Sequence, residues 1–297
     1  MPEKIGFLGL GIMGSRMAAR VARAGFPLTV WTHTPGKAAA WAAEHGESVV
    51  AADTPVEVAQ RSEIVVSMVV DGAQVASVLL GEHGVIEAAH ADLLCVDMST
   101  IAPVDSRQIA AALAERGVRM IDAPVTGSSP RAEAGTLTIM AGGAEEDFAR
   151  AEALLASMGE VIVHVGELGQ GEMLKLINNS LGAANATALA EAPLLARATG
   201  VDLDAFVQVT SAGSGASAQL ALKATPMREH DYTTLFKTDH MLKDVRLCLE
   251  EAQAAGLPFP AASHARDVLS ATAGRGYGEQ DYAALIEAVE GFAGRRV

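Results

Sequence analysis

Hydrophobic residues in the first half of the chain fall into short apolar runs, separated by stretches of helical periodicity. The apolar runs predict buried strands at 4–10, 28–31, 64–69, 93–99, 118–125, 137–143 and 161–166. Helical patterns lie between the early runs, most clearly at 13–24 and 103–116. Strands that alternate with helices favour an α/β fold with a mostly parallel sheet and right-handed crossovers.

The pattern changes after residue 166, where strand-like runs stop and helical periodicity continues to the end. We therefore predict two domains, a sheet domain over 1–165 and an all-α domain over 166–297. A single helix over about 169–198 joins them; its length is about 45 Å at 1.5 Å per residue. Pro193 is expected to kink this helix near its end.

The segment "GEMLKLINNSL" (171–181) at the start of that helix mixes core and polar residues. Its apolar residues, which predict a buried face, are Met173, Leu174, Ile177 and Leu181. Lys175 and Asn179 are one turn apart, and Asn178 lies beside them, so the three side chains are expected to point the same way. A cation and two amides on a core-like helix need an explanation.

A glycine-rich turn follows the first predicted strand. The segment "GFLGLGIMGSRMA" places Gly9, Gly11 and Gly14 in a GxGxxG pattern between a strand and a helix. In that context the pattern predicts dinucleotide binding, with the pyrophosphate at the helix N-terminus. The intervening Ile12 and Met13 belong to the same predicted cofactor loop. The alternative is a turn that serves packing alone.

Residues after the second predicted strand bear on the choice between NAD and NADP. No Asp or Glu occurs between Glu3 and Glu44, whereas a carboxylate here would bind the 2′-hydroxyl of NAD. The residues present suit a 2′-phosphate better, although an arginine is absent; they are Thr32, His33, Thr34 and Lys37. We therefore predict NADP as the preferred cofactor, with NAD as the alternative.

Further candidates follow later strands, where open α/β sheets bind ligands. Ser99 and Thr100 end one strand, with helix capping as the alternative role. The other predicted cofactor contacts are Met68, Val69 and Val70. In "DAPVTGSSPRAEAGTL" (122–137), the residues Thr126, Gly127 and Ser128 could present a hydroxyl and backbone N–H groups to a carboxylate, or form an ordinary turn.

Composition narrows the class of ligand. The formal charge of −14 over 297 residues disfavours nucleic acid and anionic membranes, so a small anionic substrate needs a local positive group such as Lys175. Neither a signal peptide nor a membrane-spanning run is apparent, and we expect a cytoplasmic protein. The two cysteines predict buried thiols, and the scattered histidines do not predict a metal site.

Four motifs, in this order, resemble those of the β-hydroxyacid dehydrogenases, which include 3-hydroxyisobutyrate dehydrogenase, tartronate semialdehyde reductase and the glyoxylate/succinic semialdehyde reductases. The matching segments are "GFLGLGIMGSRMA", "DAPVTGSSPRAEAGTLTIMAGG" (122–143), "GQGEMLKLINNSL" (169–181) and "HMLKDVRL" (240–247). The resemblance implies a Rossmann domain, a helical domain that forms homodimers or homotetramers, and a cleft between the two domains. "GSSPRAE" and "WTHT" depart from common family forms, which leaves substrate identity and cofactor preference open.

The resemblance also assigns roles to residues. It implies that Lys175 is the catalytic residue, that Asn179 contacts the substrate or orients the lysine, and that Thr126-Gly127 binds the substrate carboxylate. Lys243 matches the family lysine near the cofactor and substrate. Hydride transfer leaves one proton to be moved, and a lysine in a desolvated site can donate or accept it.

We therefore predict an NAD(P)-dependent oxidoreductase. It would interconvert a small 3-hydroxy acid and its semialdehyde, or reduce a short oxo acid such as succinic semialdehyde. Three alternatives remain. Imine reductases have Asp or Tyr in place of Lys175, a non-catalytic protein would bind NADP without turnover, and an S-adenosylmethionine enzyme could share the glycine-rich turn alone.

Overall fold

A computed structural model describes residues 2–297 and separates them into two compact units. The first unit ends at Lys175, and the second runs from Leu176 to Val297. The division falls later than the predicted boundary near residue 165, because the first turn of helix α8 (Gln170–Ala198) is hydrogen-bonded to the sheet unit. The point after residue 166 where the strand-like pattern stops therefore marks the end of the last strand, whereas the first compact unit continues to Lys175.

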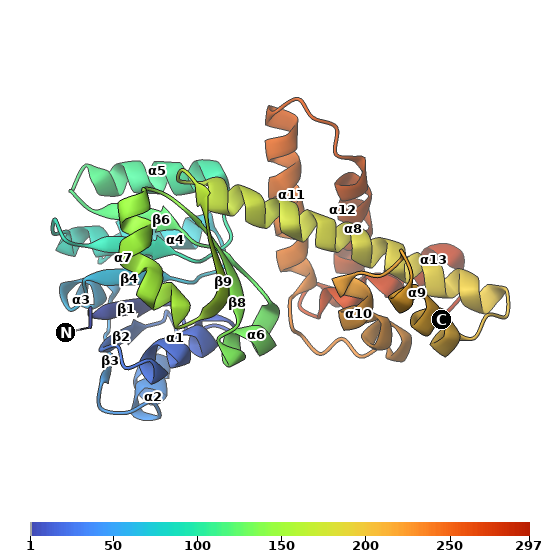
Figure 1. Ribbon diagram of the computed structural model, residues 1–297, viewed down its shortest axis with the longest axis horizontal. Helices are drawn as coiled ribbons and strands as arrows, with labels where there is room; N and C mark the ends of the chain where they lie inside the picture. Colours follow the sequence, from blue (N-terminus) through green and yellow to red (C-terminus); the bar gives the residue numbers. More distant parts are fainter. Residues whose placement is uncertain (1) are drawn as a thin grey trace. The chain divides into compact units, whose positions relative to one another are not determined.

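A nine-stranded, mostly parallel sheet organises the first unit (Figure 1). The strand order is β3-β2-β1-β4-β5-β6-β8-β7, and β9 pairs with β8. The strands are β1 (Ile5–Leu8), β2 (Leu28–Trp31), β3 (Val49–Ala51), β4 (Ile64–Ser67), β5 (Leu94–Asp97), β6 (Arg119–Asp122), β7 (Val125–Thr126), β8 (Leu137–Gly142) and β9 (Gly159–Gly166). From β3 to β6 all pairings are parallel, so the carboxyl ends of six strands meet at one edge.

Helices cover both faces of this sheet, and strand residues alternate between two cores (Figure 1). One core holds Phe7 and Val66 with residues of α1 (Gly14–Arg23), α2 (Lys37–Ala43), α6 (Ser128–Ala134) and α7 (Glu145–Ala156). The other holds Leu8 and Val65 with residues of α3 (Pro55–Gln60), α4 (Gly72–Leu80), α5 (Pro103–Ala114) and the 3₁₀ turn η1 (Val85–Ala88). This alternation confirms the α/β class predicted from the apolar runs.

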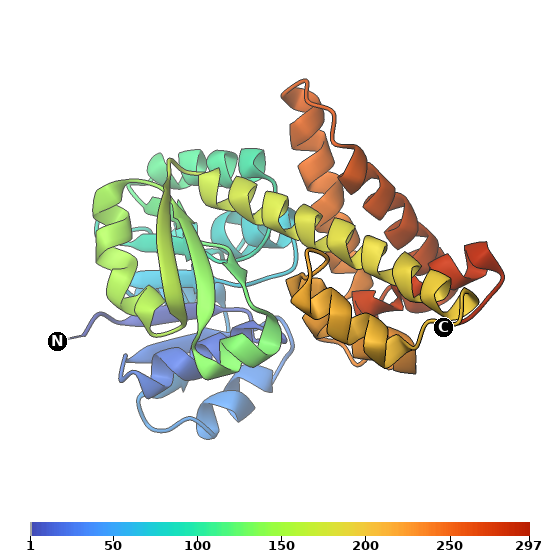
Figure 2. The same ribbon diagram turned by 45° about the vertical axis from the view of Figure 1, so that its right-hand side comes forward.

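The second unit is helical, as predicted. Besides most of α8 it contains α9 (Leu203–Ala212), α10 (Ala218–Glu229), α11 (Thr238–Ala254), α12 (Pro260–Thr272) and α13 (Leu285–Ala293), with the short turns η2 (Ala273–Tyr277) and η3 (Tyr282–Ala284). Figure 2 shows α11 and α12 side by side, with a short loop joining them. Buried side chains of five of these helices form one core, for example Leu189, Val245 and Leu269. Pro193 is accommodated inside α8, which continues past it to Ala198.

The sheet is not wholly parallel, which the apolar runs did not reveal. The run 118–125 was predicted as one strand, but it divides into β6 and β7 at Ala123 and Pro124. Strand β8 then pairs antiparallel with both β6 and β7. A two-residue strand such as β7 is too short to produce a recognisable pattern, and the same is true of the three-residue strand β3.

The predicted buried face of α8 was wrong. Leu174 and Leu181 are exposed, whereas the polar Lys175 and Asn179 are buried, with 7% and 6% of their surface accessible. Asn178 is exposed, and its Nδ2 donates a hydrogen bond to Oδ1 of Asn179 over 3.2 Å. The face of α8 toward the protein interior is lined by small residues such as Ala183 and Ala186, so the leucines lie on an uncovered face instead.

Two smaller expectations concern thiols and membranes. Cys95 and Cys248 are free and buried, as predicted. Burial raises the pKa of the Cys95 thiol to about 12, assisted by the Asp97 carboxylate, so this thiol is not a nucleophile at neutral pH. Among residues 2–297, none of the helices combines the length and apolarity that a bilayer crossing requires.

Candidate active site

The glycine-rich turn between β1 and α1 has the geometry that a pyrophosphate needs. Gly9 has φ of 106°, and a Cβ at this position would collide with the carbonyl oxygen of Met68, the residue that follows β4. A Cβ at Gly14 would collide with the carbonyl oxygen of Gly9, so the helix packs directly on the turn. In contrast, among residues 2–297 no atom beyond the two neighbouring residues lies within 4 Å of the corresponding position at Gly11. Gly9 and Gly14 thus allow the tight turn and the close packing of the helix, and Gly11 leaves space above the backbone for a ligand.

The N-terminus of α1 is suited to an anionic group. Within residues 2–297 no side chain caps this helix end, where Met13 is the N-cap residue, and its first turn contains no acidic residue. The positive end of the helix dipole and the first backbone N–H groups therefore face no internal anion. Ile12 is exposed next to the opening. These features fit a dinucleotide whose pyrophosphate lies over Gly11 to Gly14.

The residues after β2 lie where the adenosine ribose of such a cofactor is bound. Thr32 is buried, whereas His33, Thr34 and Lys37 are exposed. The Thr34 hydroxyl lies 3.4 Å from Nε2 of His33, so the two side chains form one polar surface. A hydroxyl, an imidazole and an ammonium group at this position can bind a phosphate and would repel no part of it.

The ends of β4 and β5 are joined by a buried hydrogen-bond network. The hydroxyls of Ser67 and Ser99 each donate to Oδ1 of Asp97 over 2.7 Å, and Oγ of Ser99 accepts from the backbone N–H of Val69 over 3.0 Å. Ser99 was predicted to contact the cofactor, but its side chain is fully buried and its hydroxyl is already used. Ser99 therefore fixes the loop of Met68, Val69 and Val70 through its hydrogen bond to Val69. Thr100, the next residue, is half-buried.

The loop predicted to bind a carboxylate adopts an unusual backbone. Gly127 has φ of 136° and Ser128 has φ of 57°, so two successive residues are in the positive-φ region. For a serine this conformation is uncommon, and such residues are often found at ligand sites. Thr126 is the last residue of β7, where it pairs with Thr138 of β8. Thr126, Gly127 and Ser128 are all half-buried, which leaves part of each accessible to a ligand.

Lys175 lies one turn beyond the start of α8. The start of this helix is held by Asp122 at the end of β6, and Glu172 accepts a hydrogen bond from the backbone of Ile101. Lys175 is therefore buried, with 7% of its surface exposed, on a helix whose start is hydrogen-bonded to the sheet unit. Buried lysines are rare, and a burial of this degree favours a specific role over a solvated surface charge.

In the second unit, Asp244 connects two of the predicted residues. Nδ2 of Asn179 donates to Oδ2 of Asp244 over 2.6 Å, and the ammonium group of Lys243 lies 3.1 Å from Oδ1 of the same carboxylate. Asp244 is itself buried. It fixes the orientation of the Asn179 amide, whose carbonyl oxygen accepts a hydrogen bond from Nδ2 of Asn178 over 3.2 Å. The sequence singled out Lys243 but not its neighbour, although both belong to the Lys-Asp pair of "HMLKD".

His240 lies one turn before Lys243 on α11 and is half-buried against Phe236. Burial lowers the pKa of His240, and the nearby Lys237 and Lys243 lower it further. This imidazole is therefore neutral at pH 7. His240 therefore gives the part of α11 near Lys243 a polar side chain that carries no charge.

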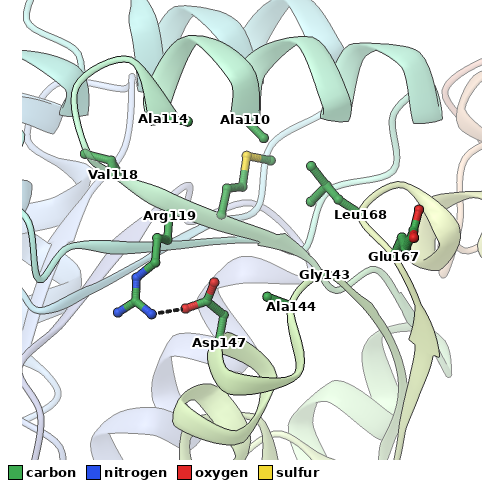
Figure 3. A pocket seen from close by; sticks show the side chains of 10 residues that line it. Ala110, Ala114, Val118, Arg119, Gly143, Ala144, Asp147, Glu167 and Leu168 are labelled. Carbon is green, nitrogen blue, oxygen red and sulfur yellow. Dashed lines mark ion pairs between the residues drawn. The ribbon is translucent and has the colours of Figure 1, made fainter.

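A shallow pocket of about 310 Å³ lies elsewhere on the first unit (Figure 3). It is lined by residues of α5, β6, α7 and the turn before α8, among them Ala110, Ala114 and Leu168. Its charged groups are Arg119, Asp147 and Glu167, and Arg119 forms an ion pair with Asp147 over 2.5 Å. None of the predicted site residues lines it, and we do not place the active site there.

One group of potential metal ligands occurs among residues 2–297. It comprises His230, Glu287 and Glu290, whose ligand atoms lie within 4.8 Å of one another. The two carboxylates already accept a hydrogen bond from Tyr232 or His230 and are paired with Arg296. No local motif indicated this cluster, because His230 lies 60 residues before Glu290 along the chain. These partners account for both charges, and the cluster joins the C-terminus to the helical core.

Two family models together match nearly the whole chain. Residues 4–166 match the NAD-binding domain of 6-phosphogluconate dehydrogenase, and residues 169–289 match the NAD-binding domain of NADP-dependent 3-hydroxyisobutyrate dehydrogenase. The chain belongs to the β-hydroxyacid dehydrogenase family. It is an NAD(P)-dependent oxidoreductase, as the glycine-rich turn and the four motifs predicted.

Similar proteins support this assignment over the full length. The 2-hydroxy-3-oxopropionate reductase of Escherichia coli K12 is 35% identical over 296 residues, which cover 99% of each chain. The 2-(hydroxymethyl)glutarate dehydrogenase of Eubacterium barkeri is 32% identical, over 98% of this chain and 96% of that protein. The solved structure of Mycobacterium tuberculosis 3-hydroxyisobutyrate dehydrogenase with L-serine has a TM-score of 0.87 and 30% identity, and covers 97% of this chain and 99% of that one.

Proposed function

We propose that the protein interconverts a small 3-hydroxy acid and its semialdehyde, or reduces a short oxo acid, with Lys175 as the general acid and base. The observation that supports this proposal best is the burial of Lys175 on α8, followed one turn later by the buried Asn179. An acid-base group of this kind must be held in place and shielded from bulk water. The structure provides both conditions for Lys175.

Each residue then has a defined task. A bound nicotinamide dinucleotide would supply the hydride during reduction and accept it during oxidation. Lys175 donates a proton to the carbonyl oxygen as the alcohol forms and removes it from the hydroxyl in the opposite direction. Asn179, held by Asp244, hydrogen-bonds the same oxygen or the ammonium group. The hydroxyl of Thr126 and the backbone N–H groups of Gly127 and Ser128 bind the substrate carboxylate.

The proposed substrate class also agrees with what the relatives act on. The names of the two curated relatives describe a reductase of an oxo acid and a dehydrogenase of a hydroxymethyl acid. In both cases a carboxylate accompanies the reacting aldehyde or primary alcohol. An acidic protein of net charge −14 must bind such an anion through local groups, which are Lys175, Lys243 and the loop at 126–128.

A substrate panel tests this function. Semialdehydes of three and four carbons are reduced with NADPH, and each is compared with the neutral aldehyde of the same length. We expect the carboxylate to raise kcat/KM by about 10²-fold or more, because the neutral compound leaves charged and polar groups without a partner. Equal rates for the two compounds, or no turnover of any anionic aldehyde, would contradict the proposed substrate class.

The exposed leucines of α8 support a further part of the proposal, a homodimer through the helical unit. Leu181, Ala188 and Leu195 are exposed and recur every seven residues, so they form one straight apolar stripe. Leu181 and Leu195 are 58% and 68% exposed. Seven-residue spacing suits a second helix packed along the first, and a second copy of the chain offers the same stripe. This face would be buried in the dimer.

Replacement of the two leucines tests the dimer. We expect Leu181→Lys combined with Leu195→Lys to give a monomer, because four ammonium groups would meet across a two-fold interface. Light scattering with size-exclusion chromatography measures the mass. The matched control is Leu257→Lys, at a leucine of the same unit that is 64% exposed but outside the stripe, and it should leave the mass unchanged. A dimeric double variant would show that the interface lies elsewhere.

A further inference from the structure

The carboxylate of Asp122 connects the sheet to the helix that contains Lys175. Asp122 ends β6 and is fully buried. Its Oδ1 accepts from the backbone N–H of Gly169 over 2.7 Å, and its Oδ2 accepts from the backbone N–H of Glu172 over 2.7 Å. Both donors belong to the start of α8, where backbone N–H groups have no partner within the helix. One side chain thus caps α8 with both of its oxygens.

Two glycines enclose this carboxylate. A Cβ at Gly142 on β8 would lie 2.6 Å from Oδ1 of Asp122, and a Cβ at Gly171 on α8 would lie 2.8 Å from Oδ2. The carboxylate therefore occupies a space that only glycines leave open. A longer acid at position 122 would not fit, and neither would a side chain at either glycine. The arrangement fixes the distance between the end of β6 and the first turn of α8.

A second carboxylate fixes the same turn in another direction. Oε2 of Glu172 accepts from the backbone N–H of Ile101 over 3.2 Å, in the loop that follows β5. Glu172 precedes Lys175 by three residues, which is close to one helical turn. The start of α8 is thus attached to β6 through Asp122 and to the β5 loop through Glu172. Four residues after Asp122 the chain reaches Thr126, the first residue of the proposed carboxylate-binding loop.

We propose that Asp122 is a positioning residue. In its ionised form it fixes the first turn of α8, and it thereby holds Lys175 in the position where it can reach a substrate bound at Thr126 to Ser128. This inference rests on the proposed function of Lys175. Asp122 touches neither substrate nor cofactor in this scheme. It acts through the two N–H groups at the start of α8, and both of its oxygens are needed as acceptors.

Protonation of Asp122 removes one of these acceptors. Burial, opposed by the N–H donors and assisted by Asp97, raises the pKa of the Asp122 carboxyl from 3.8 to about 6. The charged residues near it are Asp97 on β5, Glu172 on α8 and Arg107 on α5, whose guanidinium lies against Gly169. We therefore expect turnover to decrease as the pH falls through about 6.

The Asp122 carboxyl affects folding stability and turnover in opposite directions as the pH changes. Its pKa in the folded protein is raised above the unfolded value, so folding binds the proton more tightly. Its contribution to stability is therefore fully present at low pH and is lost as the pH rises through about 6. An acidic loss of turnover caused by Asp122 is thus not accompanied by unfolding from this group. A loss of turnover at low pH without a loss of stability therefore distinguishes a positioning role of Asp122 from a purely structural one.

Asp122→Asn tests the proposal, because an amide keeps the shape but directs an NH₂ group at one backbone N–H. We expect kcat to fall by about 10²-fold, as for a displacement of about 1 Å, with little change in the Kd of NADPH. The acidic limb of the pH profile near 6 should disappear, because position 122 no longer titrates. The matched control is Asp92→Asn, at an exposed aspartate of the same unit, which should retain wild-type kcat and the acidic limb.

The outcomes distinguish the two hypotheses. Wild-type kcat with an unchanged acidic limb in Asp122→Asn would overturn the positioning role, even if Lys175→Met is inactive. Activity in Lys175→Met would overturn the proposed function instead. Should Asp122→Asn fail to fold, the wild-type protein provides the test. The amide resonances of Gly169 and Glu172 should titrate together near pH 6, and resonances that do not move between pH 5 and 7.5 would contradict the proposal.

Discussion

Lys175→Met is expected to lower kcat for semialdehyde reduction by about 10³-fold, within the range that a positioned acid or base contributes. Methionine has a similar length and fills the buried space, but it can neither donate nor accept the proton. Because Lys175 lies on α8 and not in the glycine-rich turn, the Kd of NADPH should change by less than about threefold. Steady-state kinetics and fluorescence titration measure the two quantities.

Lys4→Met is the matched control for this result. Lys4 is exposed at the start of the sheet unit, and its replacement also removes one positive charge from an acidic protein. It should retain wild-type kcat and Kd. If Lys175→Met kept more than a few per cent of wild-type kcat, another group would have to supply the proton, and the assignment of Lys175 would fail. If NADPH binding were lost together with turnover, the effect would be on the cofactor instead.

Thr32→Asp is expected to reverse the preference for NADP that the residues after β2 predict. A carboxylate directly after β2 would accept hydrogen bonds from the ribose hydroxyls of NAD and would repel the 2′-phosphate of NADP. We expect kcat/KM with NADPH to fall by about 10²-fold, which corresponds to about 2.7 kcal/mol, while the value with NADH rises or stays constant. Parallel kinetics with the two reduced cofactors measure the ratio.

Thr199→Asp controls for the added negative charge. Thr199 is exposed just after α8, in the other unit, and its replacement should leave the cofactor ratio unchanged. A companion variant, His33→Arg, should strengthen NADPH binding, because a guanidinium binds phosphate with two parallel hydrogen bonds. A wild-type protein that uses NADH better than NADPH would overturn the preference proposed here, although not the family.

The glycine-rich turn was predictable because its chemistry is local. Gly9, Gly11 and Gly14 follow a strand and open a helix, and each has the steric role expected from its place in the pattern. The residues after β2 were also accessible to sequence reasoning, since they follow a clear apolar run. The exposure of His33, Thr34 and Lys37 agrees with their predicted part in cofactor binding, which stays a prediction.

Residues whose role depends on distant contacts were not predictable in this way. Asp122 precedes its partner Gly169 by 47 positions, and Asn179 precedes Asp244 by 65. Nothing in the local pattern indicates that these side chains meet. Periodicity likewise shows that α8 has an apolar face, but not whether Leu181 contacts this chain or a second one. In the single chain the leucine is exposed and the polar face is buried.

The most direct test of the account is a crystal structure of the protein with NADP⁺ and a 3-hydroxy acid. We expect Nζ of Lys175 to lie within hydrogen-bond distance of the substrate hydroxyl, and the carbon that bears this hydroxyl to lie about 3.5 Å from C4 of the nicotinamide. The substrate carboxylate should contact Thr126 and the N–H groups that follow it. A Lys175 side chain directed into bulk solvent, with the hydroxyl held by another group, would contradict the central claim.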